Sequence, residues 1–446
     1  MEVQKFYELI QTNKICSNLN RQIKCFGNEK DQIKQVTHIL LAFINSDISL
    51  NECEIIRLGL IQFTNLTHFK MVFNILGTNN SEQVFIYVCE ALNSLINIIN
   101  LNLIIQSQIN SEGATKLGQS LTYLKKIQDL NLVFEENVNI SEKGSIDLAK
   151  GIRCLENLQH LSLKIKQFNK LGEGGFNAIS QSIQSLNKLT QLEFKVCSDN
   201  NFEKSGQNQI DISLQSLTEL NQLNLYVSSN REQIQNRDFI QKAKTLGYLS
   251  KLINLELHFD NYLNEEYFIH LGDSLSKLQN VRKIKIKLNK LAFADNECAI
   301  MLGKGLSKLE QLNLLSMSIL TINIEEIQGL VYGLKQLYSL TELTLEFPKI
   351  VKNDYSTLNV WQGLSNLKAL KEINLLLNLE NSIQLALSLS QLNIRTANLS
   401  TFDEMKQSKQ SYEKRLDLTY SYKSRGEYGL SVLILTKFLN GNSSEY

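Results

Sequence analysis

The sequence carries almost no net charge, since 46 Lys and Arg residues oppose 45 Asp and Glu residues and leave a formal charge of +1 at pH 7. This balance argues against a protein whose main task is to neutralise the phosphates of a nucleic acid or an anionic membrane. The sequence also lacks any apolar run near the roughly 20 residues that a membrane span needs. We therefore expect neither a nucleic-acid partner nor membrane insertion.

Signals for secretion are missing as well. Residues 1–5 lead into no apolar core of a signal peptide. The seven cysteines are an odd number, widely scattered and without a CxxC pair, unlike those of disulfide-rich secreted proteins. We expect reduced thiols and a cytoplasmic location, with the cilium and the cytoskeleton left open. The single proline, beside abundant Asn, Gln, Lys and Ile, is typical of an AT-rich genome such as a ciliate's.

Common motifs of catalysis and metal binding are absent too: the sequence has no HExxH, no GxSxG and no paired CxxC. The glycine-rich run at residues 172–175 lacks the Lys-Ser/Thr pair or the third glycine of a phosphate-binding loop. Trp361, next to the apolar Val360, is expected to pack in the core rather than to hold a ligand. We expect no cofactor, no metal and no small-molecule substrate, and hence no enzyme.

What the sequence does have is 43% hydrophobic residues and an internal repeat. One eight-residue frame recurs at intervals of 28 to 32 residues, with apolar residues at its positions 1, 4, 6 and 8. Because positions 4, 6 and 8 alternate with period 2, each copy is predicted to be a strand with one buried face. The twelve frames begin at Val36, Leu66, Ile98, Ile127, Leu158, Leu189, Leu220, Leu252, Val281, Leu312, Leu340 and Leu370.

A second pattern, of helical period, fills the segments between the frames. Apolar residues stand 10, 6 and 3 positions before a frame, as Leu117, Leu121 and Leu124 do before Ile127. These offsets form one stripe of an amphipathic helix. Seven positions before each of the eleven frames after the first, the residue is always Gly, Ala, Ser or Thr, which we expect to let helix and sheet approach closely. Four repeats place a glycine fourteen positions before the frame, where we expect a turn to enter the helix.

Strand–turn–helix units of about 30 residues stack with parallel strands joined by right-handed crossovers. Such a stack must curve, because strands lie about 4.8 Å apart whereas packed helices need about 8–10 Å. We therefore predict an α/β horseshoe with an inner parallel sheet of about 12 or more strands and helices on the convex side.

These repeats resemble the leucine-rich repeats of ribonuclease-inhibitor-like proteins, over roughly residues 30–400. The strand pattern LxxLxL at residues 220–225 and the helix pattern GxxxLxxxL at residues 113–121 carry the resemblance. Members of that family usually have Asn or Cys shortly after the strand, and this chain has them only in some repeats. The resemblance implies a leucine-rich-repeat solenoid whose strand-to-helix turns are less regular than in close family members.

The two ends of the chain depart from the pattern, as expected of terminal units that cover an open core. We divide the chain into an N-terminal cap at residues 1–35, the solenoid at 36–397, and a degenerate C-terminal repeat and cap at 398–446. The N-terminal cap is expected to hold a helix around residues 2–10. The C-terminal part is expected to contain a short unit with Leu389, Leu392 and Ile394, and a degenerate one with Leu416, Leu418 and Tyr420.

Frame positions 3, 5 and 7 point away from the core and line the inner face of the sheet. These 36 positions carry six lysines and six acidic residues, a balance that disfavours a nucleic-acid groove. Lys283, Lys285 and Lys287 make one frame wholly basic, and two frames further on Glu342 and Glu346 make one acidic. One interpretation is a solvated sheet that neutralises its own charges. The functional interpretation is a polarised docking patch for a partner of complementary charge.

Histidine and tyrosine also fall on this face. His38 and His68 hold equivalent positions on adjacent frames, but two ligands without a nearby thiol or carboxylate make a poor zinc site. Tyr226 and His258, expected on neighbouring strands, are better candidates for interface anchors. The predicted partner-binding residues are Tyr226, Glu256, His258, Lys283, Lys285, Lys287, Glu342 and Glu346.

We therefore expect a non-catalytic protein-interaction or scaffold module that is a subunit of a larger assembly. Two alternatives stay open from fold analogy, which is a weak warrant for function. One is a regulator of a small GTPase, because Ran GTPase-activating proteins resemble this repeat class. The other is a substrate receptor of a ubiquitin ligase, although 35 N-terminal residues leave little room for an adaptor-binding domain.

Overall fold

The computed structural model describes residues 15–17, 35–44, 48–75, 80–200, 204–228, 243–263, 265–291, 297–347, 349–351, 362–377, 394, 396–401 and 414–416. The predicted helix at residues 2–10, Trp361, Leu389, Leu392, Leu418 and Tyr420 lie outside the described residues. The chain divides into two compact units, Met1–Arg231 and Glu232–Tyr446, and each is described by itself.

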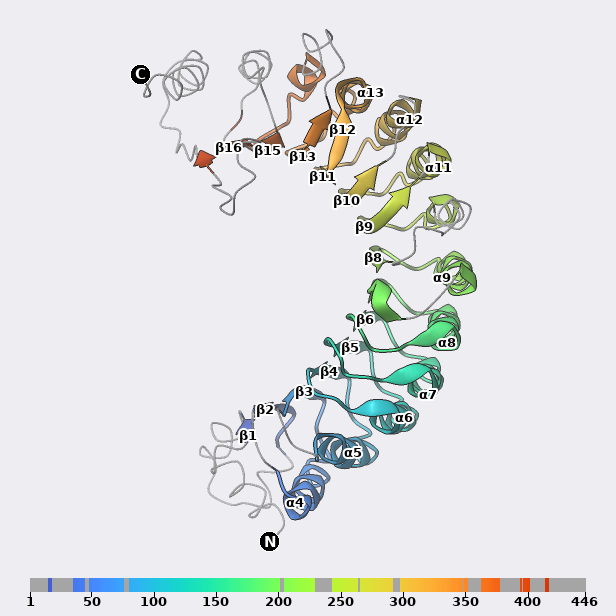
Figure 1. Cartoon of the computed structure of the whole chain (residues 1–446), viewed down its shortest axis with the longest axis vertical. Helices are drawn as coiled ribbons and strands as arrows, with labels where there is room; N and C mark the ends of the chain where they lie inside the picture. Colours follow the sequence, from blue (N-terminus) through green and yellow to red (C-terminus); the bar gives the residue numbers. More distant parts are fainter. Residues whose placement is uncertain are drawn as a thin grey trace. The chain divides into compact units, whose positions relative to one another are not determined.

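The first unit is a stack of strand–turn–helix repeats. Its parallel strands are β2 (His38–Ile44), β3 (His68–Asn74), β4 (Asn100–Ile105), β5 (Asp129–Phe134), β6 (His160–Ile165), β7 (Gln191–Val196) and β8 (Gln222–Val227). The short strand β1 (Ile15–Ser17) pairs antiparallel with β2 at the edge of the sheet. One face of the sheet is covered by α4 (Leu50–Leu60), α5 (Ser81–Leu92), α6 (Asn110–Leu121), α7 (Ser141–Arg153), α8 (Gly172–Gln184) and α9 (Lys204–Ser216) (Figure 1). A 3-10 turn, η1 (Ser198–Asn200), precedes α9.

The second unit repeats this arrangement. Its parallel strands are β9 (Asn254–Leu263), β10 (Lys283–Leu291), β11 (Leu314–Ile319), β13 (Glu342–Phe347), β15 (Glu372–Leu377) and β16 (Thr396–Thr401). The strand β17 (Lys414–Leu416) pairs antiparallel with β16, and β12 (Thr321–Asn323) pairs with β14 (Lys349–Val351) in a separate small sheet. The helices are α11 (Glu265–Leu275), α12 (Glu297–Leu306) and α13 (Ile324–Leu334), with a 3-10 segment η2 (Gln362–Asn366).

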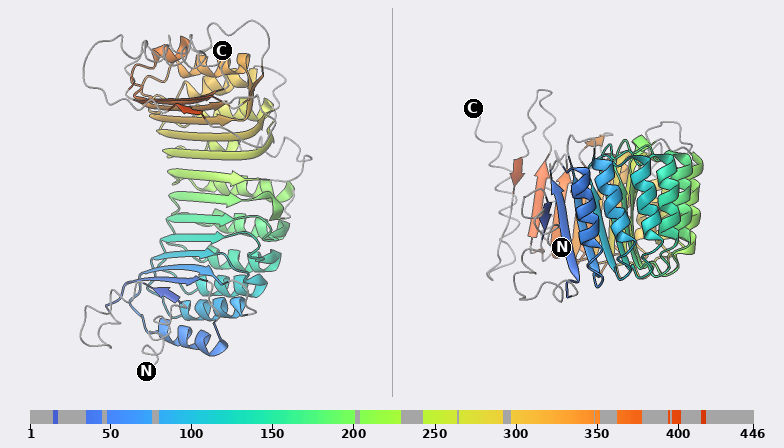
Figure 2. Two further views of the ribbon diagram at one scale, coloured as in Figure 1. Left: turned by 60° about the vertical axis from the view of Figure 1, so that its left-hand side comes forward. Right: turned by 90° about the horizontal axis from the view of Figure 1, so that it is seen from below.

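The register of both sheets confirms the predicted strand frame. Each strand from the twelve frames begins two residues after the first residue of its frame, as β6 begins at His160 after Leu158. Pairing joins equal frame positions, for example Leu161 with Leu192 and Leu163 with Phe194. In each unit the strands lie side by side with the helices on one face (Figure 2). This is the predicted leucine-rich-repeat architecture, and we call the opposite, helix-free face of each sheet its inner face.

The helices end earlier than the apolar stripe predicts. α6 ends at Leu121 and α12 at Leu306, six residues before the next frame, so the third residue of the stripe falls in the following turn. Leu124 and Leu309 are nevertheless buried. The prediction that all three apolar residues lie on one helix was therefore wrong for the third. That residue lies in the turn after the helix, and its side chain covers the core where the chain enters the next strand.

The column of small residues faces the neighbouring helix rather than the sheet. A Cβ atom added to Gly151 in α7 would stand 2.1 Å from the carbonyl oxygen of Gly118 in α6. Two serines of the column bond to the preceding helix: Ser120 Oγ donates to the carbonyl oxygen of Cys89 at 2.7 Å and Ser213 Oγ to that of Ser180 at 2.6 Å. Ser182 Oγ instead donates to the carbonyl oxygen of Ile179 in its own helix. The expected close approach of helix and sheet was therefore wrong. Small residues bring successive helices together, which narrows the mismatch between helix spacing and strand spacing.

The glycines fourteen positions before a frame lie inside the helices rather than in the turns before them. Gly144 is the fourth residue of α7, and a Cβ atom there would stand 2.8 Å from the Cβ atom of Ala114 in α6. Gly175 is the fourth residue of α8, and its Cβ atom would stand 2.7 Å from that of Ser145 in α7. The predicted turn role was wrong, and these glycines serve the contact between helices as well.

Asparagine does connect the turns of the first unit, at a later position than the family pattern predicts. Asn169 is fully buried, and its Nδ2 donates to the carbonyl oxygens of Glu135 at 2.7 Å and Lys166 at 3.1 Å. Its Oδ1 accepts from the backbone of Asn139 at 3.0 Å, and its own backbone donates to Asn200 Oδ1 at 2.9 Å. Asn139 has a φ of 62°, which asparagine tolerates better than most residues. In this stretch asparagine side chains link successive turns.

The C-terminal frame begins later than predicted. β16 pairs with β15 in parallel, and Leu399 lies opposite Leu375. Since equal frame positions pair, the frame begins at Ile394, which is buried, and not at Leu389. Leu416, predicted in a degenerate repeat, lies in the antiparallel strand β17.

Cys53, Cys89 and Cys154 carry free thiols. Burial raises the pKa of Cys53 to about 11 and raises that of Cys89 as well, so both pack as uncharged side chains. Within the described ranges, no helix combines the length and the apolar character that crossing a bilayer requires.

Candidate docking surface

The predicted basic and acidic frames lie on β10 and β13, on either side of β11. Across these strands the inner-face rows are Lys283–Leu314–Glu342, Lys285–Ser316–Thr344 and Lys287–Ser318–Glu346. On the other side of β10, the residues of β9 that pair with the lysines are Asn254, Glu256 and His258. We call the inner face of β9, β10, β11 and β13 the docking surface. Neighbouring strands lie about 4.8 Å apart, so β10 and β13 are separated by about 9.6 Å.

The three lysines of β10 are exposed and have no ionic partner among the described residues. No described carboxylate lies within 4.0 Å of their Nζ atoms, although Glu256 stands opposite Lys285 in the register. Their Cα atoms follow one another at about 6.6–6.8 Å, the distance between alternate residues of a strand. Three like charges at this spacing repel one another, and Glu256 on the adjacent strand offsets only part of this repulsion.

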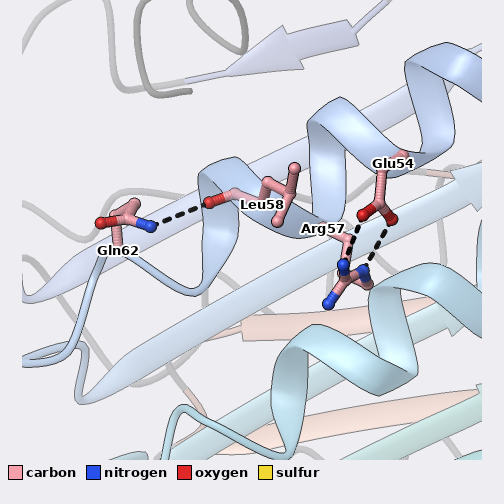
Figure 3. Close-up of polar contacts among 4 residues, drawn as sticks. All are labelled: Glu54, Arg57, Leu58 and Gln62. Atoms are coloured by element: carbon pink, nitrogen blue, oxygen red, sulfur yellow. Dashed lines mark hydrogen bonds and ion pairs between the residues drawn. The ribbon is translucent and has the colours of Figure 1, made fainter. Parts of the chain in front are cut away.

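Charged side chains on the helices behave differently. On α4, Arg57 Nε donates to Glu54 Oε2 at 2.7 Å and Arg57 Nη2 donates to Glu54 Oε1 (Figure 3). The hydrogen bond from Arg57 holds the pKa of Glu54 below its usual value. At the end of α11, Asp273 Oδ2 lies 2.7 Å from Nζ of Lys277, which follows the helix in the next turn. These pairs are spaced by three or four residues, as expected for neighbours on a helix surface.

On the inner face of the first unit, the charges of β6 and β7 are paired with one another. Glu193 Oε2 accepts hydrogen bonds from Lys164 Nζ and from Ser162 Oγ, each at 2.8 Å, and Glu193 Oε1 lies 2.8 Å from Lys195 Nζ. Burial acts to raise the pKa of Glu193, but the hydrogen bonds from Lys164, Lys195 and Ser162 outweigh it and lower the pKa to about 2. The carboxylate therefore stays ionised at neutral and mildly acidic pH. The self-neutralising interpretation therefore describes this part of the sheet.

The histidines of the first unit do not converge on a metal position. The rings of His38 and His68 stack with centroids 4.0 Å apart and planes 12° apart, so their nitrogen lone pairs lie in nearly parallel planes. His68 Nδ1 is 2.9 Å from Thr67 Oγ1, and His160 Nδ1 bonds to Asp129. Burial and the neighbouring His38 lower the pKa of His68. Over the described ranges, no three His, Cys, Asp or Glu side chains come together as metal ligands.

The predicted anchors belong to different units. Tyr226 is a half-buried residue of β8 in the first unit. His258 is a half-buried residue of β9 in the second unit and lies opposite Lys287 in the register. The expected contact between Tyr226 and His258 would join the two units, and it stays a prediction. The structure groups Glu256, His258 and the lysines within one unit.

The glycine-rich run at residues 172–175 forms the start of α8 and receives a carboxylate of this chain. The backbone nitrogen of Gly174 donates to Glu142 Oε1 at 2.6 Å. A Cβ atom at Gly172, whose φ is 66°, would stand 2.8 Å from Glu142 Cδ. Helix N-termini stabilise negative charge through their free amides. Here the carboxylate of Glu142 in α7 bonds to the first turn of α8, so the run serves a contact between these two helices.

No protein-family model matches the chain, and no curated protein matches it. Among solved structures, an internalin of Listeria monocytogenes is similar with a TM-score of 0.47 and 17% identity, over 82% of this chain and 88% of the internalin. A structure of a TLR13 complex with ssRNA13 is similar with a TM-score of 0.42 and 16% identity, over 83% of this chain and 48% of the other. This chain thus spans about half the length of that second protein. Likenesses this distant say nothing about partners.

Proposed function

We propose that the chain is a protein-binding or scaffold module without a catalytic step, a subunit of a larger assembly in a reducing, cytoplasmic compartment. Its docking surface receives an electronegative region of a protein partner. The observation that carries this proposal is the row of exposed lysines on β10, Lys283, Lys285 and Lys287, without an ionic partner among the described residues.

A structural reason for this row is hard to find. The buried side of β10 is made by Ile284, Ile286 and Leu288, so the lysines add nothing to the core. Neutral side chains would serve the strand equally well and would avoid the repulsion between like charges. A row of unpaired charges is useful when an opposite charge arrives from outside, because complementary charges speed association and select partners.

The partner chemistry that fits best is that of a protein. A nucleic-acid groove is expected to be basic over its whole width. Here Glu342, exposed, and Glu346, half-buried, lie two strands away from the lysines, and Glu372 on β15 follows. These carboxylates would repel a phosphate backbone laid across the sheet. A folded protein can instead present opposite charges a few ångströms apart.

Reversal of the lysine row tests this proposal. The variant with Lys283→Glu, Lys285→Glu and Lys287→Glu is expected to keep the melting temperature of the wild type, since all three side chains are exposed. It is expected to capture partners more weakly from a cell extract, and the capture is expected to lose most of its salt dependence. Affinity purification at low and high salt, followed by mass spectrometry, measures both effects.

A matched control changes the net charge equally at other exposed positions of the same unit. Lys244→Glu, Lys304→Glu and Lys308→Glu serve this purpose, and this control is expected to capture partners as the wild type does. If the β10 variant captures its partners as well as the wild type at low salt, the inner face is not the docking surface. The outer helices or residues 401–446 would then become the candidates.

A further inference from the structure

We propose that the docking surface receives an α-helix with an acidic stripe on one flank and a basic stripe on the other, lying along the strands above β11. This inference rests on the proposed function and specifies the partner for the same surface. It starts from the order of charges across three adjacent strands, which is basic on β10, uncharged on β11 and acidic on β13.

The uncharged strand β11 lies between the two charged rows, and we call its inner-face residues the floor of the docking surface. On β11 the inner-face residues are Leu314, Ser316 and Ser318, all half-buried. Lysine and glutamate side chains reach much farther from the sheet than serine does. In the register, Lys287 and Glu346 flank Ser318. A ligand bound over β11 therefore meets the positive charges of β10 on one side and the negative charges of β13 on the other.

The width of this floor suits a helix. β10 and β13 are about 9.6 Å apart, and a helix with its side chains is about 10–12 Å across. Along the strand the lysines repeat every 6.6–6.8 Å or so, close to the roughly 6 Å rise between residues i and i+4 of a helix. An extended peptide along the same line would point a single row of side chains at the sheet. It could meet one charged row but not both.

The acidic residues of β13 disfavour a partner helix that carries acidic residues on all sides. Such a helix would satisfy Lys283, Lys285 and Lys287 while placing like charges beside Glu342 and Glu346, and like-charge contacts suppress binding. Glu342 and Glu346 have no ionic partner among the described residues either. They therefore remain available for lysines or arginines on the second flank of the incoming helix.

Designed probes test the inference directly. The first probe is a small three-helix bundle whose exposed helix carries Glu on one flank, Lys on the other and Ala and Ser between them. A second probe has the same composition with the charges scrambled, and a third has Glu on both flanks. By biolayer interferometry at low salt, the striped probe is expected to bind the wild-type chain about tenfold more tightly than either control, because several weak exposed ion pairs must add to give a preference.

Variants of the chain complete the test. Reversing Lys283, Lys285 and Lys287 to Glu, or Glu342 and Glu346 to Lys, is expected to abolish the preference for the striped probe. Reversing all five is expected to restore it, because the helix can then lie in the opposite direction. Thermal melts confirm that each variant is folded, and Glu342→Lys alone, at an exposed position, is available should the Glu346 change unfold the unit.

Two results would overturn the striped helix. One is that the probe with Glu on both flanks binds as tightly as the striped probe. The other is that none of the three probes binds the wild-type chain more tightly than it binds the lysine-reversal variant, although natural partners are still lost on lysine reversal. Either result leaves the docking surface of the proposed function intact, whereas partner capture that ignores lysine reversal removes both proposals.

Discussion

Replacing Leu223 by alanine is expected to lower the free energy of unfolding by about 2–5 kcal/mol, the usual cost of truncating a buried leucine. Leu223 is buried in β8, opposite the equally buried Leu192 of β7. In a stack of repeats each unit depends on its neighbours, so the loss is expected to unfold the adjoining repeats as well. Urea unfolding followed by circular dichroism measures the change.

The control for this substitution is the next residue along the strand. Asn224 lies on the inner face, half-buried, and its Oδ1 is a buried atom without a hydrogen-bond partner among the described residues. Asn224→Ala therefore removes no core contact and is expected to cost less than about 1 kcal/mol. Equal losses for Leu223→Ala and Asn224→Ala would contradict the strand register.

Replacing Gly151 by alanine is expected to destabilise the first unit, although alanine in a helix is normally favoured over glycine by about 1 kcal/mol. The added Cβ atom would stand 2.1 Å from the carbonyl oxygen of Gly118, a backbone atom that can move only with α6. Overpacking of this kind costs about 1–3 kcal/mol and sometimes more. Thermal unfolding of the purified chain measures the loss.

The matching control is Gly247→Ala. A Cβ atom at Gly247 would have its nearest neighbours at 3.3 Å, the side-chain atoms Lys277 Cδ and Ser274 Oγ, which can move by a few tenths of an ångström. This variant is expected to change the melting temperature little. If Gly151→Ala instead raised the melting temperature, the close approach of α6 and α7 would be refuted.

The strand frame could be predicted from the sequence because alternation of apolar residues has a direct physical cause. In a sheet with one buried face, Leu161 and Leu163 must point into the core and Ser162 must point away. The same frame in twelve copies then fixes the parallel register. The alternation does not specify which element a small helix residue contacts. A glycine such as Gly151 is compatible with a contact to either the sheet or a neighbouring helix.

The candidate site was predicted only as a set of positions. The frame places Glu193 and Glu256 at equivalent positions, each near lysines of the same or an adjacent strand. Glu193 bonds to Lys164 and Lys195, whereas Glu256 makes no ion pair with Lys285 among the described contacts. Which charges pair depends on side-chain reach and burial, which the frame does not specify. Only the structure shows that Glu193 is paired with lysines whereas Glu256, within the described part of the chain, makes no ion pair with Lys285.

The most direct test of the central claim is photo-crosslinking from the floor of the docking surface. A benzoylphenylalanine at Ser318 is expected to form adducts with the partner, and the reversal of Lys283, Lys285 and Lys287 is expected to abolish them. The same crosslinker at Ile300, exposed on α12, is expected to form none of these adducts. Adducts that arise from Ile300 alone, or adducts at Ser318 that persist after lysine reversal, would contradict the claim that the inner face of the second unit binds the partner.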